Sequence, residues 1–358
     1  MRHLLFFIAC VFSTVGALSQ EINASDVIEN PAFQLQIDKT LQALEEIKSI
    51  YSTSTNAPLD TGKIRRIREI LEETQPNTLS IYGDKVIYDD PLTPGVQDDR
   101  QNLFRANSFE MSAARSVALV VNRADLLDVG DGQLFALPGT PLGLCPSERF
   151  HREPAPGFCT SFRVGKDLIA TAGHCIKHQA QCTRTSFVFG FAMESEADEP
   201  NKKISASEIY HCREIIDGEL NGPDQSDWRV VRVGREMDAD IPIASLRRDG
   251  EIEVGDAITI IGHPMGLPLK VTPGGVVRRR DVSFFVANPD TYGGNSGSPA
   301  FNTRRLQAGE LLVEGILVRG EDDFEQFTPC MISKVCPENG CRGEDVTYAS
   351  EVVTALLP

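Results

Sequence analysis

A serine lies in a glycine-rich turn in the last quarter of the sequence, in the run Gly293-Gly294-Asn295-Ser296-Gly297. Glycines on both sides of the serine permit a tight turn and a close approach of the backbone to a bound molecule. Consecutive backbone N–H groups in such a turn can point at one oxygen atom, as an oxyanion hole requires. A turn of this composition is more often only a turn, so a second motif has to support a nucleophile.

A histidine with distinctive neighbours supplies that second motif. Within the run 168–175, an apolar, strand-like stretch leads to His174, which stands between a glycine and a cysteine. Cys159 opens the preceding predicted strand, and a Gly-Lys-Asp turn between the two strands can bring its sulfur to that of Cys175. We therefore expect a disulfide between Cys159 and Cys175 that holds the histidine's loop on the protein body.

Together the two motifs resemble those of the trypsin-like serine peptidases. The matching runs are Thr171-Ala172-Gly173-His174-Cys175 and Gly294-Asn295-Ser296-Gly297-Ser298-Pro299. Asn295 before the serine and Ser298-Pro299 after it are most similar to the bacterial branch that includes the glutamyl endopeptidases. The resemblance covers about residues 86–358. It implies two antiparallel six-stranded β-barrels with the active site in the cleft between them.

The resemblance also requires an aspartate at the start of a strand between the histidine and the serine. Asp227 begins the run Asp-Trp-Arg-Val-Val-Arg-Val, which fits in order and in pattern, although Arg229 replaces the usual small residue. Asp217 and Asp224 lie nearby and remain alternatives, because a triad is defined by a geometry that sequence does not show.

Elementary chemistry gives each residue of this triad a role. A neutral hydroxyl is a poor nucleophile, so His174 would accept the proton of Ser296 and then donate it to the leaving amine. Asp227 would orient the imidazole and stabilise its charged form. The backbone N–H groups of Gly294 and Ser296 would stabilise the oxyanion. We expect an endopeptidase that forms an acyl-enzyme and needs no metal and no organic cofactor.

The resemblance places four residues at the pocket for the side chain before the scissile bond: Asp290, Thr291, Leu317 and Arg319. Glutamyl endopeptidases have a histidine where Leu317 stands, so the main partner of a substrate carboxylate is missing and Arg319 is a candidate substitute. Asp290 occupies the position of the acid that selects basic residues in trypsin, but a loop cap explains it equally well. The preference for acidic, basic or apolar residues stays open.

Asn295 bears on activation as well. In trypsin-like zymogens an aspartate at this position pairs with a newly freed N-terminal amine, whereas Asn295 offers no charge. That switch is expected to be absent. Apolar residues at helical spacing predict two helices within 31–71. We interpret residues 18–85 as a helical N-terminal segment that acts as an intramolecular propeptide of a zymogen, with a permanent N-terminal domain as the alternative.

The elements that position the motifs are predicted to be strands. After residue 80 the sequence consists of short β-rich runs separated by Gly, Pro and Asp turns, which favours an all-β fold over alternating βαβ units. We place the peptidase domain at 86–358, its first barrel at about 110–235, its second at about 245–343 and a C-terminal helix at 344–357. The predicted strands are 116–121, 157–164, 168–172, 186–191, 228–233, 257–262, 282–287 and 311–318.

Composition bounds the location and the partners. Residues 1–17 have the basic start, apolar core and small-residue cleavage site of a signal peptide, which predicts a secreted or periplasmic protein. Removing them leaves eight cysteines, an even number suited to disulfides. A net charge of -16 disfavours nucleic acid and membrane surfaces, so we expect protein or peptide substrates. The competing hypothesis is a catalytically silent homologue that serves as an extracellular binding module.

Overall fold

The computed structural model describes residues 98–195, 203–220, 225–249, 252–320, 322–327, 329–336 and 341–356. The chain divides into two compact units, residues 1–78 and 79–358, and every described residue belongs to the second. The predicted signal peptide (1–17) and helical segment (18–85) lie outside the described residues. Within the described ranges, no helix is long and apolar enough to cross a membrane.

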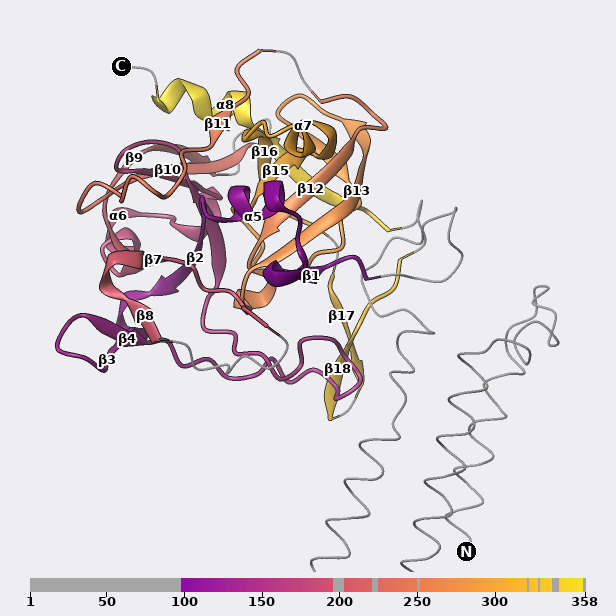
Figure 1. Cartoon of the computed structure of the whole chain (residues 1–358). Coiled ribbons are helices and arrows are strands. Elements are labelled where there is room, and N and C mark those ends of the chain that lie inside the picture. Colours follow the sequence, from indigo (N-terminus) through magenta and orange to yellow (C-terminus); the bar gives the residue numbers. More distant parts are fainter. Residues whose placement is uncertain are drawn as a thin grey trace, which may run out of the picture. The chain divides into compact units, whose positions relative to one another are not determined.

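The first half of the described chain forms a closed antiparallel barrel in the order β10-β6-β5-β2-β7-β9 (Figure 1). Hydrogen bonds between β9 and β10 complete the ring. The six strands are β2 (Val117–Asn122), β5 (Cys159–Arg163), β6 (Leu168–Thr171), β7 (Thr185–Phe189), β9 (Ile209–Leu220) and β10 (Asp227–Val233).

The second half forms another closed antiparallel ring, β13-β12-β15-β16-β19-β14, which the pairing of β13 with β14 completes. The strand β1 (Gln101–Asn102) pairs with β13, and β11 (Ser245–Leu246) runs parallel to β16. The six barrel strands are β12 (Ala257–Gly262), β13 (Lys270–Arg280), β14 (Phe284–Ala287), β15 (Pro299–Asn302), β16 (Leu312–Arg319) and β19 (Glu344–Tyr348). The all-β fold with two six-stranded barrels is confirmed.

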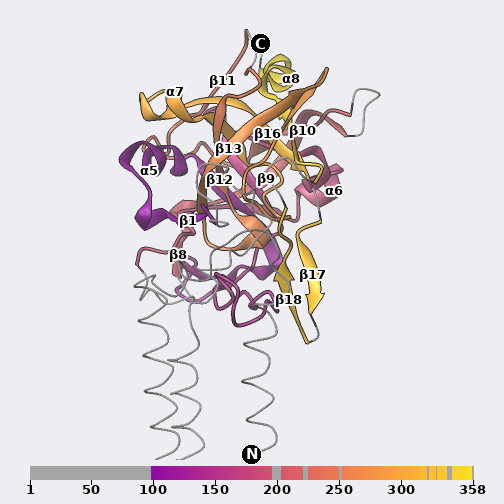
Figure 2. The same cartoon turned by 90° about the vertical axis from the view of Figure 1, so that its right-hand side faces the viewer.

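Smaller elements surround the barrels. The hairpin β17 (Phe324–Phe327) and β18 (Cys330–Ser333) projects from the second barrel in both views (Figures 1 and 2). The strands β3 (Leu127–Asp128), β4 (Leu134–Ala136) and β8 (Lys203–Ser205) form a separate sheet. The helices are α5 (Ser108–Ala114), α6 (Gln179–Cys182), α7 (Thr303–Gln307) and α8 (Ala349–Val353), with short 3₁₀ turns η2 (Leu103–Arg105), η3 (Arg123–Asp125), η4 (Gly173–Cys175), η5 (Ala206–Glu208), η6 (Pro264–Gly266) and η7 (Thr354–Leu356).

Strand β2 shows why some runs are apolar throughout. Ala118 and Val120 face the barrel interior, while Leu119 and Val121 pack on the other side against residues that include Leu137 and Ile204. Because successive side chains of a strand point to opposite faces, a strand buried on both faces loses the alternation of apolar and polar residues. Packing on both faces therefore accounts for the unbroken apolar run at 117–121.

Each of the eight predicted strands overlaps an observed one, but the C-terminal helix begins later than predicted. Residues 344–348 form β19, which pairs with β14 and β16, so the second barrel extends to 348 and not to 343. The helix α8 starts at Ala349 and contacts β10, β11 and β16. The helical spacing of Val346 or Tyr348 with Val352 and Leu356 extended the prediction too far back, because tertiary pairing overrides local periodicity.

Candidate active site

His174 lies in the 3₁₀ turn that follows β6. Gly173 is required at this turn, because a Cβ there would lie 2.2 Å from the carbonyl oxygen of Glu219 and 2.9 Å from a carboxylate oxygen of Asp227. The predicted disulfide between Cys159 and Cys175 is present. It ties the residue after the histidine to the start of β5, so the loop is fixed on both sides of the imidazole.

Asp227 begins β10 and reaches the histidine with both carboxylate oxygens. Its Oδ2 lies 2.8 Å from Nδ1 of His174, and its Oδ1 accepts a hydrogen bond from the backbone N–H of His174 at 3.1 Å. The aspartate side chain is 4% exposed and the histidine side chain 34%. A carboxylate on Nδ1 selects the imidazole form that carries its proton there, which leaves Nε2 able to accept a proton.

The two alternative aspartates do not make this contact. Asp217 is exposed on β9, where its Oδ1 accepts a hydrogen bond from the N–H of Gly218. Asp224 lies outside the described residues. The pairing of Asp227 with His174 thus agrees with the order and pattern of the sequence.

Ser296 lies in the turn before β15 and belongs to the second barrel. Its carbonyl oxygen accepts a hydrogen bond from the N–H of Thr160 at 2.8 Å and lies 3.5 Å from the sulfur of Cys175. Its hydroxyl donates to the carbonyl oxygen of Val318 at 3.4 Å. Strand β5 of the first barrel therefore touches both the serine and, through the disulfide, the histidine's loop.

The glycine after the nucleophile has the conformation that its position demands. Gly297 has a φ of +93°, and a Cβ there would lie 2.0 Å from the carbonyl oxygen of Thr160. Its N–H donates to the carbonyl oxygen of Leu317 at 2.7 Å. Only glycine combines a left-handed conformation with so close an approach of the two backbones.

Two carbonyl groups in the turn fix the direction of the predicted oxyanion donors. In a trans peptide the C=O and the N–H of the same plane point in opposite directions. The carbonyl of Gly293 accepts from the N–H of Met265 at 2.5 Å, which turns the N–H of Gly294 away from Met265. The carbonyl of Asn295 accepts from the N–H of Ser298 at 2.9 Å, so the N–H of Ser296 points away from that bond.

Asn295 is buried and acts within the turn. Its Nδ2 donates to Oγ1 of Thr291, and its Oδ1 accepts from Oγ of Ser298 at 3.2 Å. These bonds are between neutral groups. They engage both polar atoms of the Asn295 amide. This residue stands where a charged activation pair would need a carboxylate.

A small cavity opens beside Ser296. Leu317 and Arg319 line it together with Tyr292, Gly293, Gly320, Asp323 and Glu344. Sequence reasoning did not identify Asp323 and Glu344 as pocket residues, since acids in a loop and at a strand start carry no motif. Asp323 accepts a hydrogen bond from the N–H of Gly293 at 2.6 Å, and burial raises the pKa of Asp323 to about 6.

The other two predicted pocket residues, Asp290 and Thr291, are not among the residues that line this cavity. Asp290 is 4% exposed, and its Oδ2 accepts a hydrogen bond from the N–H of Asp99 at 3.1 Å. Burial, together with the nearby Asp99, raises the pKa of Asp290 well above its ordinary value. Thr291 is 1% exposed and binds Asn295. Asp290 therefore anchors the loop, in agreement with the loop-cap interpretation.

Arg319 is engaged by neighbours at the edge of the cavity. Its Nε donates to Oδ2 of Asp345 at 2.9 Å, and its Nη2 donates to the carbonyl oxygen of Gln225. Asp345 is fully buried, so its carboxylate balances the guanidinium charge. This arrangement weakens Arg319 as the substitute partner for a substrate carboxylate.

The comparisons with known proteins agree with this geometry. Residues 159–308 match the family model of the trypsin-like peptidase domain. Residues 159–308 are therefore similar to a trypsin-like peptidase domain. A relative from Synechocystis, named "Putative serine protease HhoA", is 29% identical over 119 residues, which are 30% of this chain and 29% of the relative. The chain thus matches less than a third of that relative's length.

Solved structures also resemble this chain at low identity. A Glu endopeptidase is 17% identical with a TM-score of 0.43, covering 73% of this chain and 95% of its own. An inactivated protease paralogue of the scabies mite is 12% identical with a TM-score of 0.42, covering 69% and 94%. Human heparin binding protein is 13% identical with a TM-score of 0.42, covering 71% and 94%. The fold assignment rests on the two closed barrels and not on these likenesses.

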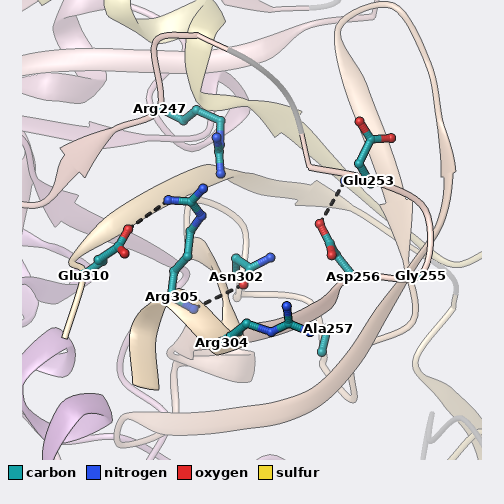
Figure 3. A pocket seen from close by; sticks show the side chains of 9 residues that line it. All are labelled: Arg247, Glu253, Gly255, Asp256, Ala257, Asn302, Arg304, Arg305 and Glu310. Carbon is teal, nitrogen blue, oxygen red and sulfur yellow. Dashed lines mark hydrogen bonds and ion pairs between the residues drawn. The ribbon is translucent and has the colours of Figure 1, made fainter. Parts of the chain in front are cut away.

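Two other features of the described chain have no part in the chemistry considered above. A cavity of about 580 Å³ on the second barrel contains no triad residue, and its charged side chains include the ion pair of Arg305 with Glu310 at 2.9 Å (Figure 3). Potential ligand atoms of Cys159, His174 and Cys175 lie within 4.8 Å of one another. The two sulfurs are bonded to each other, so they are not the thiolates that a metal site needs.

Proposed function

We propose that this protein is a serine endopeptidase that uses Ser296, His174 and Asp227. The observation that carries the proposal is the bond of 2.8 Å between Nδ1 of His174 and a carboxylate that is 4% exposed. A buried carboxylate in this position orients the imidazole and stabilises the imidazolium that forms during reaction. The match to the trypsin-like peptidase domain supports the same assignment.

The proposed reaction gives each group the role that its chemistry permits. Nε2 of His174 accepts the proton of Ser296 as its Oγ attacks the carbonyl carbon of the scissile bond. The N–H groups of Gly294 and Ser296 stabilise the resulting oxyanion. The imidazolium donates its proton to the leaving amine, which leaves an acyl-enzyme that water hydrolyses by the same steps. Substrates are proteins or peptides.

The location follows from disulfide chemistry. Four disulfides join the eight cysteines outside residues 1–17, and such bonds persist in oxidising compartments. An extracytoplasmic location is therefore indicated. We further propose that residues 1–17 direct export and that residues 18–85 act as a propeptide. N-terminal sequencing of the active, exported protein tests both ideas, and finding residues 18–85 still attached would contradict the propeptide.

The experiment for the activity is covalent labelling. A fluorophosphonate probe reacts with a serine only when a base activates it, so wild-type protein should be labelled and Ser296→Ala should not. Hydrolysis of a randomised peptide library should disappear in the same variant. Correctly folded and processed wild-type protein that is neither labelled nor active would sink the enzyme proposal and favour the silent binding module.

A further inference from the structure

Residues 98–100, here called the strap, contact the loop that leads to the nucleophile. The guanidinium carbon of Arg100 lies 3.7 Å from the ring centroid of Tyr292, and its Nη2 donates to the Tyr292 hydroxyl at 2.7 Å. Arg100 is 1% exposed and forms an ion pair with Asp98 at 2.8 Å. The N–H of Asp99 binds Asp290. The strap thus holds two residues of the loop, four and six positions before Ser296.

Tyr292 is also held from other parts of the chain. Its ring packs against Phe324, with ring centroids 4.7 Å apart, and its hydroxyl bonds to Oγ of Ser333. Ser333 in turn binds Glu148, which follows the disulfide of Cys145 closely in sequence. Arg100 therefore completes a buried polar network around one tyrosine. Buried hydrogen bonds of this kind restrict the positions of the groups that they join.

The position of Tyr292 controls the turn that presents the oxyanion donors. Its carbonyl oxygen accepts from the N–H of Asn295 at 3.2 Å, which closes the turn 292–295. The peptide between Gly293 and Gly294 lies inside that turn. Its orientation decides whether the N–H of Gly294 or the carbonyl of Gly293 faces the attacking serine. If Tyr292 were displaced, this peptide would no longer be held in one orientation.

We propose that Arg100 is a positioning residue for the oxyanion hole, acting through Tyr292. This inference rests on the proposed peptidase function. Asn295 offers no carboxylate for a charged activation pair, and its amide is already bound to Thr291 and Ser298. The strap supplies a guanidinium from within the chain instead. Because a side chain makes the contact, the ordered loop requires no free α-amine.

Steady-state kinetics of matched variants test this role. Arg100→Ala should lower kcat at least tenfold with little change in KM, because the oxyanion donors act in the transition state. Its affinity for a peptidyl boronic acid, whose adduct places an oxygen in the oxyanion hole, should fall by a similar factor. Arg100→Lys should recover only part of kcat, since an ammonium group cannot stack as a plane. Added guanidinium chloride at millimolar concentration should partly rescue Arg100→Ala.

Two comparisons separate positioning from mere stability. Arg115→Ala removes an exposed ion pair with Asp240 and should leave kcat unchanged. Tyr292→Phe removes the hydroxyl that Arg100 binds, so the double variant should lose less than the product of the two single losses. If Arg100→Ala keeps kcat within twofold of wild type below its melting temperature, the proposal is overturned.

Hydrogen exchange tests the strap even if the protein proves inactive. In Arg100→Ala, amides of 290–298 should exchange at least tenfold faster than in wild type, while those of β7 should not. Unchanged exchange at 290–298 would contradict the proposal. A wild type that shows neither labelling nor turnover would instead contradict the proposed function. The exchange result would still test whether Arg100 orders the loop 290–298.

Discussion

The two barrels contribute to the candidate site in different ways. In the first barrel, His174 and Asp227 bond directly, and the disulfide at Cys175 fixes the histidine's loop to the adjacent strand. In the second barrel, the carbonyl of Ser296 accepts one backbone hydrogen bond from β5, and the loop before Ser296 is held by the strap. Contacts within the first barrel thus position the candidate base, whereas contacts between segments far apart in the sequence position the candidate nucleophile and its loop. The two halves should respond differently to substitution.

The largest effect is expected in the first barrel, at Asp227. Asp227→Asn should lower kcat by about 10⁴-fold near neutral pH, because the amide no longer favours the imidazole form that accepts the serine proton. Initial rates with a peptide substrate measure this loss. Asp217→Asn changes an exposed acid of β9 and should leave kcat unchanged. Equal losses of kcat in both variants would mean that the contact between Asp227 and His174 is not what enables His174 to act as a base.

The nucleophile's turn should be the next most sensitive point. Gly297→Ala places a methyl group 2.0 Å from the carbonyl oxygen of Thr160 and strains a residue with a φ of +93°. We expect a loss of unfolding free energy of about 3 kcal/mol or more, with loss of activity. Gly132→Ala is the matched control, since its φ is +76° but no atom lies within 4 Å, and it should cost about 1 kcal/mol. Urea unfolding compares the two, and equal costs would show that β5 does not confine the turn.

The disulfide between Cys159 and Cys175 lies within the first-barrel half and should rank third. Replacing both cysteines with serine should cost about 3 kcal/mol for a separation of 16 residues, and kcat should fall because the histidine's loop is released. The pair Cys336 and Cys341, separated by 5 residues, offers the control. Its removal should cost about 2 kcal/mol and leave kcat unchanged. Unaltered kcat in the first variant would show that the loop is fixed without the bond.

Sequence predicts the first-barrel half better than the second-barrel half for a physical reason. The histidine's motif, the partner cysteine and the strand of Asp227 have local patterns, because each lies in or beside a hairpin. The long strands β9 and β13 were missed, since β9 mixes charged residues with apolar ones along twelve positions and β13 contains Pro273 and two glycines. Pairing with neighbours on both sides overrides these weak local signals.

The residues around the pocket show the same limit of prediction from sequence more clearly. Asp290 has the sequence position of a substrate-binding acid, yet the N–H of Asp99, 191 residues earlier, binds it. Arg100 has no motif at all, and its role depends on Tyr292, which is 192 residues away. Separations of this kind leave no pattern in one sequence. The structure also revealed Asp323 and Glu344 beside Ser296, which resemblance did not point to.

The smallest expected effect concerns Asp323 at the cavity of the second-barrel half. Burial raises its pKa from 3.8 to about 6, so the carboxyl ionises more readily in the unfolded chain than in the folded one. The resulting penalty is absent below pH 3.8, grows as pH rises to 6 and stays constant above it. Two pKa units bound this penalty at about 3 kcal/mol, and the partial exposure of Asp323 reduces it to about 1–2 kcal/mol.

Asp323→Asn removes the charge while its amide oxygen can still accept from the N–H of Gly293. The variant should therefore gain stability relative to wild type between pH 4 and pH 7, which melting temperatures at both values would show. Asp322→Asn, at the exposed neighbouring residue, should show no such gain. A difference for Asp323→Asn that stays flat or falls with pH would mean that the carboxyl is not desolvated. Asp323 would then contribute no electrostatic penalty to the second-barrel half.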